Sequence, residues 1–260
     1  MRFCIIGHPV SHSKSPELYN RFFKLKDIDA DYKAVDISPD TFEKEIKSLL
    51  KYYDGLNVTI PFKERIINFI DNKTEKSLGA VNCIYRGAGY NTDWLGFIAP
   101  LRDEIIAEPV LVIGAGGAAQ AAVYAMKELK VSRLIVVNRT LEKAERIKLN
   151  FEVPGVFEVE VLPLDDLKSA VRDSKTVVNT TSVGMKGECF DIAASDMRGA
   201  SLLYDIIYWE TPLARLAKES GVRRVIDGSE MLLRQAQENL KLWGFSDTSG
   251  FEEIFREVVG

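Results

Sequence analysis

The chain has few of the residues on which several common active-site designs depend. Histidine occurs only twice in 260 residues, as His8 and His12. This excludes a mechanism that needs a histidine base elsewhere in the chain, and it excludes a histidine-rich metal site. The two histidines are separated by Pro9 and followed by serines, so they lie in a loop, and no third ligand is evident. We therefore expect no metal.

Cysteines, basic runs and long apolar segments are also scarce. The three cysteines are far apart in sequence, and their number is odd. This argues against a disulfide framework and fits a reducing compartment. The formal net charge is -4 without a Lys/Arg run, so we expect no nucleic-acid or membrane partner. Because no apolar run reaches the ~18–20 residues of a membrane span, we expect a cytoplasmic protein.

What the sequence does contain is a regular alternation of short apolar strands and longer helical patterns. Such alternation is typical of parallel sheets, so we predict an α/β protein with two α/β domains. Hydrophobic spacing predicts early helices over residues 15–26, 62–70 and 94–106. We expect a substrate-binding domain over 1–100, a Rossmann-type domain over 101–226, and C-terminal helices over 227–260 that return to the first domain.

A glycine loop follows the predicted strand over residues 110–113 and precedes a predicted helix. Its spacing is G-x-G-x-x-A, a variant of the dinucleotide-binding fingerprint. The first glycine permits a tight turn, the second lets a pyrophosphate approach the backbone, and free N–H groups at the helix start bind its charge. The residues that we expect to contact the cofactor here are Gly114, Ala115, Gly116, Gly117 and Ala118.

The next strand, over residues 133–137, ends where the adenosine ribose is expected. NAD enzymes usually carry Asp or Glu there, but this chain has Asn138, Arg139 and Thr140, with Lys143 one turn later. A carboxylate would repel a 2′-phosphate, whereas a guanidinium binds it through two hydrogen bonds. The sequence therefore predicts NADP (NADPH) rather than NAD.

Four polar segments of the first domain lie next to predicted strands, where α/β sheets usually bind ligands. They comprise residues 7–16, 57–64, 79–82 and 91–93. Together they offer hydroxyls, amides, one cation and one carboxylate, a set that suits a small, polyhydroxylated anion. In the absence of a suitable histidine, Lys63 is the best proton donor for carbonyl reduction, and Asp93 can hold its ammonium group by a charge-assisted hydrogen bond.

These segments, in this order, resemble the shikimate dehydrogenase family. Further family-like motifs are N-T-T-S-V-G over residues 179–184, Y-D-I-I-Y over 204–208, and Asp227-Gly228 followed by Met231 and Gln235. The resemblance implies that Ser13 and Ser15 bind the substrate carboxylate and that Lys63 and Asp93 are catalytic. The remaining implied substrate residues are Asn57, Thr59, Asn82, Tyr208 and Gln235, and Ile206 and Gly228 are implied at the nicotinamide.

The resemblance implies reversible, NADP-dependent reduction of 3-dehydroshikimate to shikimate, a step of chorismate and aromatic amino acid biosynthesis. Two alternatives stay open. One is a quinate/shikimate dehydrogenase that uses NAD or NADP, and the other is an inactive dinucleotide-binding regulator, which the presence of both Lys63 and Asp93 disfavours. We expect small-molecule partners only and a monomer or homodimer.

Overall fold

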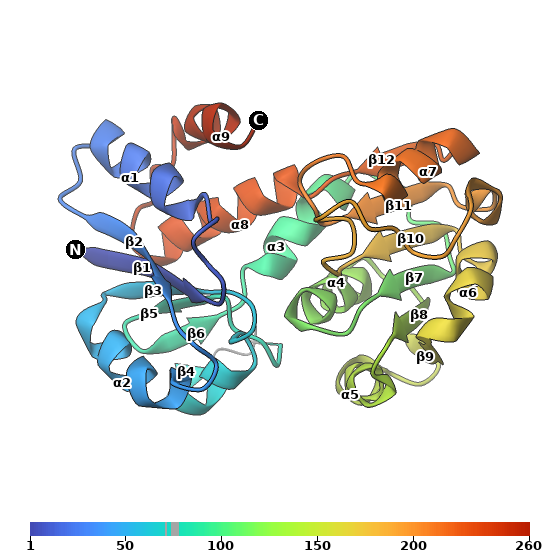
Figure 1. Cartoon of the computed structure of the whole chain (residues 1–260), viewed down its shortest axis with the longest axis horizontal. Helices are drawn as coiled ribbons and strands as arrows, with labels where there is room; N and C mark the ends of the chain where they lie inside the picture. The colour runs from blue at the N-terminus through green and yellow to red at the C-terminus, as the bar shows by residue number, and fades with distance from the viewer. Residues whose placement is uncertain (71, 74–77) are drawn as a thin grey trace. The chain divides into compact units, whose positions relative to one another are not determined.

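The computed structural model describes residues 1–70, 72–73 and 78–260, which form two compact α/β units (Figure 1). The first unit comprises Met1–Thr92 together with Gln235–Gly260, and the second comprises Asp93–Arg234. The domain limits at residues 100 and 226 stay predictions. The boundary between Arg234 and Gln235 falls within helix α8 (Ser229–Leu242), and the residues from Gln235 to the C-terminus belong to the first unit.

The sheet of the first unit has the strand order β2-β1-β3-β5-β6-β4. Its strands are β1 (Arg2–Gly7), β2 (Asp31–Asp36), β3 (Gly55–Val58), β4 (Asn72–Lys73), β5 (Cys83–Tyr85) and β6 (Ala88–Tyr90). Strand β1 is parallel to both β2 and β3, whereas β5 is antiparallel to β3 and to β6. The sheet is therefore mixed, because a tight hairpin joins β5 to β6.

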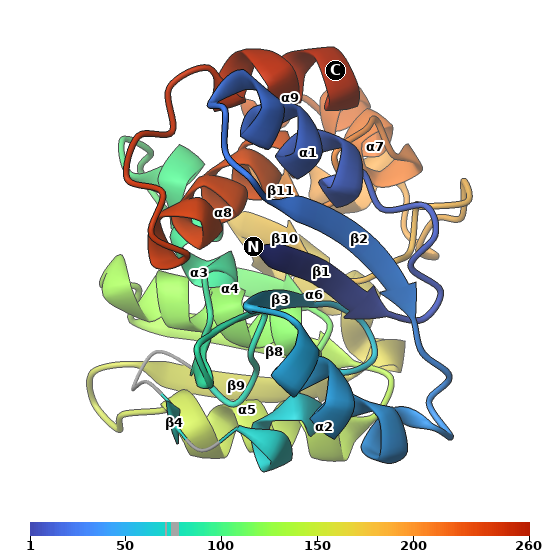
Figure 2. The ribbon, with the colours of Figure 1, turned by 90° about the vertical axis from the view of Figure 1, so that its left-hand side faces the viewer.

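Helices cover both faces of this sheet. Successive side chains of β1 point to opposite faces, so the strand presents residues to the helices on each side. Cys4 and Ile6 pack with residues of α2 (Phe42–Tyr52) on one face. Phe3 lies on the other face against Trp243 of the C-terminal segment, with ring centroids 4.7 Å apart. Helices α1 (Ser15–Leu25) and α9 (Phe251–Val259) lie side by side on that second face (Figure 2).

The sheet of the second unit is parallel throughout, in the order β12-β11-β10-β7-β8-β9. Its strands are β7 (Val110–Ile113), β8 (Arg133–Asn138), β9 (Glu158–Pro163), β10 (Thr176–Asn179), β11 (Leu202–Asp205) and β12 (Arg224–Ile226). The chain order reverses between β7 and β10. This is the doubly wound arrangement of dinucleotide-binding folds, and it confirms the predicted class.

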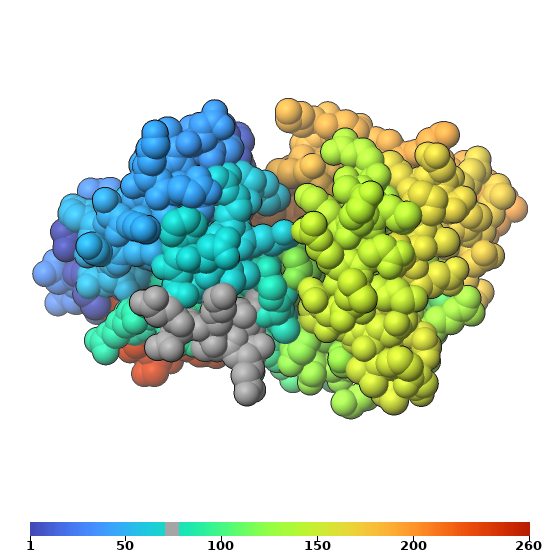
Figure 3. Space-filling view, turned by 90° about the horizontal axis from the view of Figure 1, so that it is seen from below, coloured from blue at the N-terminus to red at the C-terminus, as the bar shows by residue number. Residues whose placement is uncertain are grey.

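Helices also cover both faces of the second sheet. Helices α6 (Leu167–Asp173) and α7 (Pro212–Ser220) bury their apolar residues against Leu111, Ile135 and Leu203 on one face. On the other face lie α3 (Asp93–Ile98) and α4 (Gly117–Glu128), and Phe97 stacks on Tyr204 of β11. Helix α5 (Leu141–Phe151) and β9 supply the yellow-green surface of this unit in Figure 3.

Two of the predicted helices differ from the structure. The helix expected over 94–106 ends at Ile98 and continues only as the 3-10 turn η3 (Ala99–Leu101), because Pro100 lacks the N–H that a longer helix needs. The segment 62–70 forms the 3-10 helix η1 (Arg65–Phe69), since so short a run of apolar residues does not distinguish the two helix types. Further 3-10 turns are η4 (Leu164–Asp166) and η5 (Ala194–Met197).

Candidate active site

The polar segments of the first unit meet at one edge of its sheet. Strands β1 and β3 are parallel and end there, whereas β5 is antiparallel and begins there. Strand β6, antiparallel to β5, ends at the same edge. The segments next to these strand ends carry the predicted substrate residues Ser13, Ser15, Thr59 and Asn82 and the predicted catalytic residue Lys63. The sheet topology therefore gathers residues that are distant in sequence.

The loop after β1 is held by a carboxylate on the neighbouring strand. Oδ1 of Asp36 lies 2.7 Å from Nδ1 of His8, and Oδ2 accepts from the Val10 backbone N–H at 2.8 Å. The hydrogen bond from His8 and the bond from Val10 lower the pKa of Asp36. Ser13, further along the loop, accepts from the Ser15 backbone N–H at 3.3 Å. Asp36 therefore fixes the loop that presents the two serines.

Backbone bonds fix Thr59 and Lys63 after β3. The Thr59 N–H donates to the Ile6 carbonyl at 2.9 Å, and the Thr59 carbonyl accepts from Phe62 at 2.9 Å. The Lys63 carbonyl accepts from the Val81 N–H at 2.8 Å, which ties Lys63 to the residue before Asn82. The Lys63 side chain is half-buried. A half-buried ammonium group is accessible enough to donate a proton to a ligand.

The Asn57 side chain forms hydrogen bonds within the first unit that the sequence does not predict. It is 6% exposed, and its Oδ1 accepts from the Tyr32 hydroxyl at 2.7 Å. Its Nδ2 donates to the backbone carbonyl of Asn82 at 3.1 Å. Burial raises the pKa of Tyr32 well above its usual value, so this hydroxyl stays protonated and remains a donor. Asn57 thus positions the main chain of Asn82.

Asn82, Thr92 and Gln235 come together in the first unit. The Thr92 backbone N–H donates to Oδ1 of Asn82 at 2.7 Å, and Nδ2 of Asn82 lies 3.4 Å from Oε1 of Gln235. Asn82 is 3% exposed, and Gln235, on α8, is half-buried. Asp93 directly follows Thr92, is also buried, and is the first residue of α3. Two amides predicted to bind substrate hydroxyls are therefore neighbours.

The glycine loop of the second unit has the geometry that a pyrophosphate requires. Gly114 has φ +111°, a conformation that favours glycine, and a Cβ there would lie 2.5 Å from Oγ1 of Thr180. A Cβ at Gly116 would meet no atom of the described residues within 4 Å, so the space over this backbone is open. Gly116 precedes α4, whose first N–H groups can bind phosphate. These residues fit a dinucleotide.

The residues predicted to bind the 2′-phosphate lie at the end of β8. Nδ2 of Asn138 donates to the Thr140 carbonyl at 2.7 Å, which turns the chain before α5. Arg139, Thr140 and Lys143 are exposed, and the Lys143 backbone N–H bonds to Thr140 at 3.2 Å. Arg139 and Lys143 therefore place two cations within about one turn of the strand end, with Glu142 as the one carboxylate of residues 138–143. This donor set fits a phosphate monoester better than a ribose diol.

The residues predicted to contact the nicotinamide follow β11 and β12. Ile206, predicted at the nicotinamide, and Tyr208, predicted to bind the substrate, are half-buried, and burial raises the pKa of Tyr208. The Gly228 N–H donates to the Ile207 carbonyl at 3.0 Å. A Cβ on Gly228 would collide with the backbone of Ile206, so only glycine permits this approach. The two segments therefore form one surface at the carboxyl edge of the sheet.

A buried network behind this surface was missed by our sequence analysis. Asp205 is 1% exposed, and it accepts from Oγ1 of Thr211 at 2.7 Å, from Nδ2 of Asn179 at 3.0 Å and from the Ile207 N–H at 3.2 Å. Burial raises the pKa of Asp205, while these donors oppose the rise. The motifs at 179–184 and 204–208 contain Asn179, Asp205 and Ile207, and Thr211 follows the second motif, but only the fold shows that they meet.

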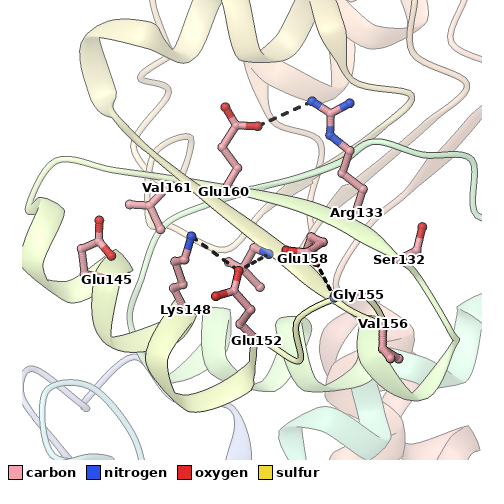
Figure 4. A pocket seen from close by; sticks show the side chains of 11 residues that line it. Ser132, Arg133, Glu145, Lys148, Glu152, Gly155, Val156, Glu158, Glu160 and Val161 are labelled. Carbon is pink, nitrogen blue, oxygen red and sulfur yellow. Dashed lines mark hydrogen bonds and ion pairs between the residues drawn. The ribbon is translucent and has the colours of Figure 1, made fainter.

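A cavity of about 580 Å³ in the second unit lies away from these residues (Figure 4). Arg133, at the amino end of β8, is one of the residues that line this cavity. The glycine loop and Asn138 lie at the carboxyl ends of the strands, which is the opposite edge of the sheet. Four charged groups of the cavity pair with one another, Arg133 with Glu160 at 3.6 Å and Lys148 with Glu152 at 3.4 Å. We do not assign it to catalysis.

Among residues 1–70, 72–73 and 78–260, no group of three or more His, Cys, Asp or Glu side chains could hold a metal ion. None of the helices in that part of the chain is long and apolar enough to cross a membrane.

Comparison with known proteins gives consistent matches to both units. Residues 5–84 match the family model "Shikimate dehydrogenase substrate binding domain", and residues 101–186 match "Shikimate / quinate 5-dehydrogenase". "Shikimate dehydrogenase (NADP(+))" of Thermotoga maritima is 44% identical over 260 residues, which is 100% of both chains.

Solved structures give the same result. A crystal structure of shikimate dehydrogenase from Thermotoga maritima matches with a TM-score of 0.92 at 44% identity, covering 100% of both chains. The Thermus thermophilus enzyme in complex with NADP(H) and shikimate matches with a TM-score of 0.81 at 30% identity, covering 99% of each chain.

Proposed function

The chain belongs to the shikimate dehydrogenase family, and we propose that it interconverts 3-dehydroshikimate and shikimate with NADP as the hydride carrier. The observation that carries this proposal is the joint presence of two sites. One unit gathers hydroxyls, amides and the Lys63 ammonium at a sheet edge, and the other has a glycine loop followed by Arg139. A hydroxylated anion and a phosphorylated dinucleotide fit these groups respectively.

Reduction of the ketone needs a hydride at carbon and a proton at oxygen. NADPH supplies the hydride when it is bound. The Lys63 ammonium hydrogen-bonds the keto oxygen, stabilises the negative charge that develops there, and then transfers one proton to it. Its neutral amine regains a proton from solvent. We assign to Asp93 the role of orienting Lys63 through a charge-assisted hydrogen bond.

The other predicted residues bind rather than react. We assign Ser13 and Ser15 to the carboxylate, because the Asp36-held loop presents both hydroxyls at the sheet edge. Thr59, Asn82, Gln235 and Tyr208 are assigned to the rest of the substrate. Asn57 acts through Asn82, because both ends of its amide already bond to protein groups.

On the cofactor side, the assignments follow the three segments at the carboxyl edge of the second sheet. The proposed pyrophosphate contacts are Gly114, Ala115, Gly116, Gly117 and Ala118. Arg139 and Lys143 bind the 2′-phosphate, with Asn138 and Thr140 shaping the turn between them. Ile206 and Gly228 border the nicotinamide, and the collision that a side chain at Gly228 would cause explains the glycine.

Quinate is the second candidate substrate, since the family model matched by the second unit names both compounds. We expect the purified protein to form NADPH from NADP with shikimate. When quinate replaces shikimate, or NAD replaces NADP, we expect kcat/KM to be at least tenfold lower, which is a difference of about 1.4 kcal/mol in transition-state binding. Absorbance of the reduced nicotinamide, measured for each substrate with each nucleotide, gives the comparison. Higher kcat/KM for quinate would contradict the shikimate assignment.

We also propose a cytoplasmic location, because Cys4 and Cys189 are in no disulfide and thiols persist in a reducing compartment. We propose that the protein acts as a monomer or homodimer. Its partners in this proposal are the small molecules alone.

A further inference from the structure

We propose that Asp205, at the end of β11, is a positioning residue for the nicotinamide half of the cofactor. It holds two segments at the carboxyl edge of the second sheet, which are residues 180–183 after β10 and residues 206–208 after β11. The inference rests on the proposed function, because it concerns the cofactor of that reaction. Asp205 is not among the residues assigned to the substrate, the cofactor or the proton transfer.

Asp205 is a carboxylate in a place where a strand ordinarily carries an apolar residue. It is 1% exposed, and the three residues before it on β11, Leu202, Leu203 and Tyr204, are fully buried hydrophobics. Burial of a polar or charged group costs free energy unless hydrogen bonds replace those to water. Two side chains and one backbone N–H make these bonds, so the carboxylate joins the segments that carry the donors.

Backbone groups fix the direction of two of these bonds. The Ile207 N–H can only donate, and it lies 3.2 Å from Oδ1 of Asp205. Oγ1 of Thr211 accepts from the Ala214 N–H at 3.1 Å, as the N-cap of α7, and gives its own hydrogen to Oδ2 of Asp205 at 2.7 Å. Asp205 therefore joins the residue after Ile206 to the first turn of α7.

The third bond connects Asp205 to the loop after β10. The Thr181 N–H can only donate, so the Asn179 atom 3.0 Å away is Oδ1, which also accepts from the Thr181 hydroxyl at 2.8 Å. The Asn179 NH2 group then points to Oδ1 of Asp205 at 3.0 Å and to the Val183 carbonyl at 3.2 Å. The Val183 N–H in turn donates to Oγ1 of Thr181 at 3.1 Å. Asn179 therefore links Asp205 to both ends of residues 181–183.

These segments belong to the half of the sheet that receives the nicotinamide. A dinucleotide lies across the point where the strand order of a doubly wound sheet reverses, here between β7 and β10. The glycine loop and Arg139 follow β7 and β8, on the adenosine side, whereas the three partners of Asp205 lie at or after the ends of β10 and β11. Both segments contain half-buried residues, so they can contact a ligand.

The glycine loop is anchored by other bonds. The Thr180 N–H donates to the Ile113 carbonyl at 3.0 Å, and the Thr180 hydroxyl donates to the same oxygen at 2.7 Å. The Gly114 N–H donates to the Val137 carbonyl at 2.8 Å. None of these three bonds involves Asp205, so its loss should loosen the nicotinamide side while the adenosine side stays in place.

The test measures two dissociation constants by isothermal titration calorimetry. One ligand is NADPH, and the other is adenosine 2′,5′-bisphosphate, which has the adenosine and the 2′-phosphate but no nicotinamide. In Asp205→Leu, which fills the space without a hydrogen bond, we expect the Kd for NADPH to rise about tenfold, the value of one lost hydrogen bond. The Kd for the bisphosphate should change by less than about twofold, because its site shares no partner with Asp205.

Three further variants complete the experiment. Asn179→Leu breaks the same link at its other end and should give the same pattern. Asp205→Asn keeps one acceptor for Asn179 and Ile207. Its NH2 group can donate to Thr211, so this variant should bind NADPH within about threefold of the native protein. Asp173→Leu removes an exposed aspartate of α6 in the same unit and is the matched control.

The comparison of the two ligands separates positioning from stability. A rise of the same factor for both would mean that Asp205 only stabilises the unit, and it would overturn the proposal, as would an unchanged Kd for NADPH in the leucine variants. Thermal melting identifies a leucine variant that does not fold, and the other one then decides. A native protein that binds NADPH without turning over shikimate would instead refute the proposed function, and the two ligands would still test Asp205.

Discussion

Replacing Lys63 by alanine is expected to lower kcat by about 10³-fold while the KM for shikimate changes by less than about threefold, because a general acid acts mainly in the transition state. The proposed proton donor is lost, and no histidine can replace it, since His8 is engaged by Asp36 and His12 is exposed in the same loop. Steady-state rates of shikimate oxidation measure both constants.

Two variants control this experiment. Lys47→Ala removes an exposed lysine of α2 in the same unit and should change neither constant. Lys63→Arg keeps a positive charge but does not release its proton at ordinary pH, so it should bind shikimate and remain slow. If Lys63→Ala lost the same factor in substrate affinity as in kcat/KM, with kcat unchanged, Lys63 would be a binding residue only.

The second large effect is expected at the cofactor. Replacing Arg139 by aspartate exchanges a guanidinium for a carboxylate that repels a 2′-phosphate and can bond to a ribose hydroxyl instead. We expect the ratio of kcat/KM for NADP to that for NAD to fall by about 10²-fold or more, since bonds to charged groups are each worth about 1.5–3 kcal/mol and the new contact is repulsive. The ratio is measured with shikimate held at saturation.

Arg146→Asp is the matched control, because it makes the same charge change at an exposed arginine on α5 and should leave the ratio unaltered. Lys143→Ala should lower the ratio less than Arg139→Asp, because an ammonium gives up the planar pair of donors. An unchanged ratio in Arg139→Asp would show that the phosphate is bound elsewhere.

The parts of this fold that the sequence predicts are those encoded locally. The glycine loop has its strand before it and its helix after it, so its place at the start of α4 follows from a few neighbouring residues. The same holds for Asn138 and Arg139. An error of one or two residues in the predicted end of β8 would still leave both of them at the end of that strand. Helix α3 ends at Ile98, shortly before Pro100, and the hydrophobic spacing over 94–106 does not by itself show where the helix stops.

The parts that the sequence does not predict depend on pairs far apart in the chain. Asn239 is one of several polar residues on α8, and only the fold shows that it is fully buried beside Thr92. Asp36 likewise ends β2 as an ordinary acidic residue, yet it holds the loop of His8. Burial turns such residues into fixed hydrogen-bond partners, and burial comes from tertiary structure.

The most direct test of this account is the transfer of deuterium from NADPH labelled with two deuterium atoms at carbon 4 of the nicotinamide to 3-dehydroshikimate. We expect the native protein to give shikimate with one deuterium on the carbon that bore the ketone, detected by mass spectrometry. We expect Lys63→Ala to form the same product far more slowly. Shikimate formed without deuterium, or no product from folded protein, would contradict the account.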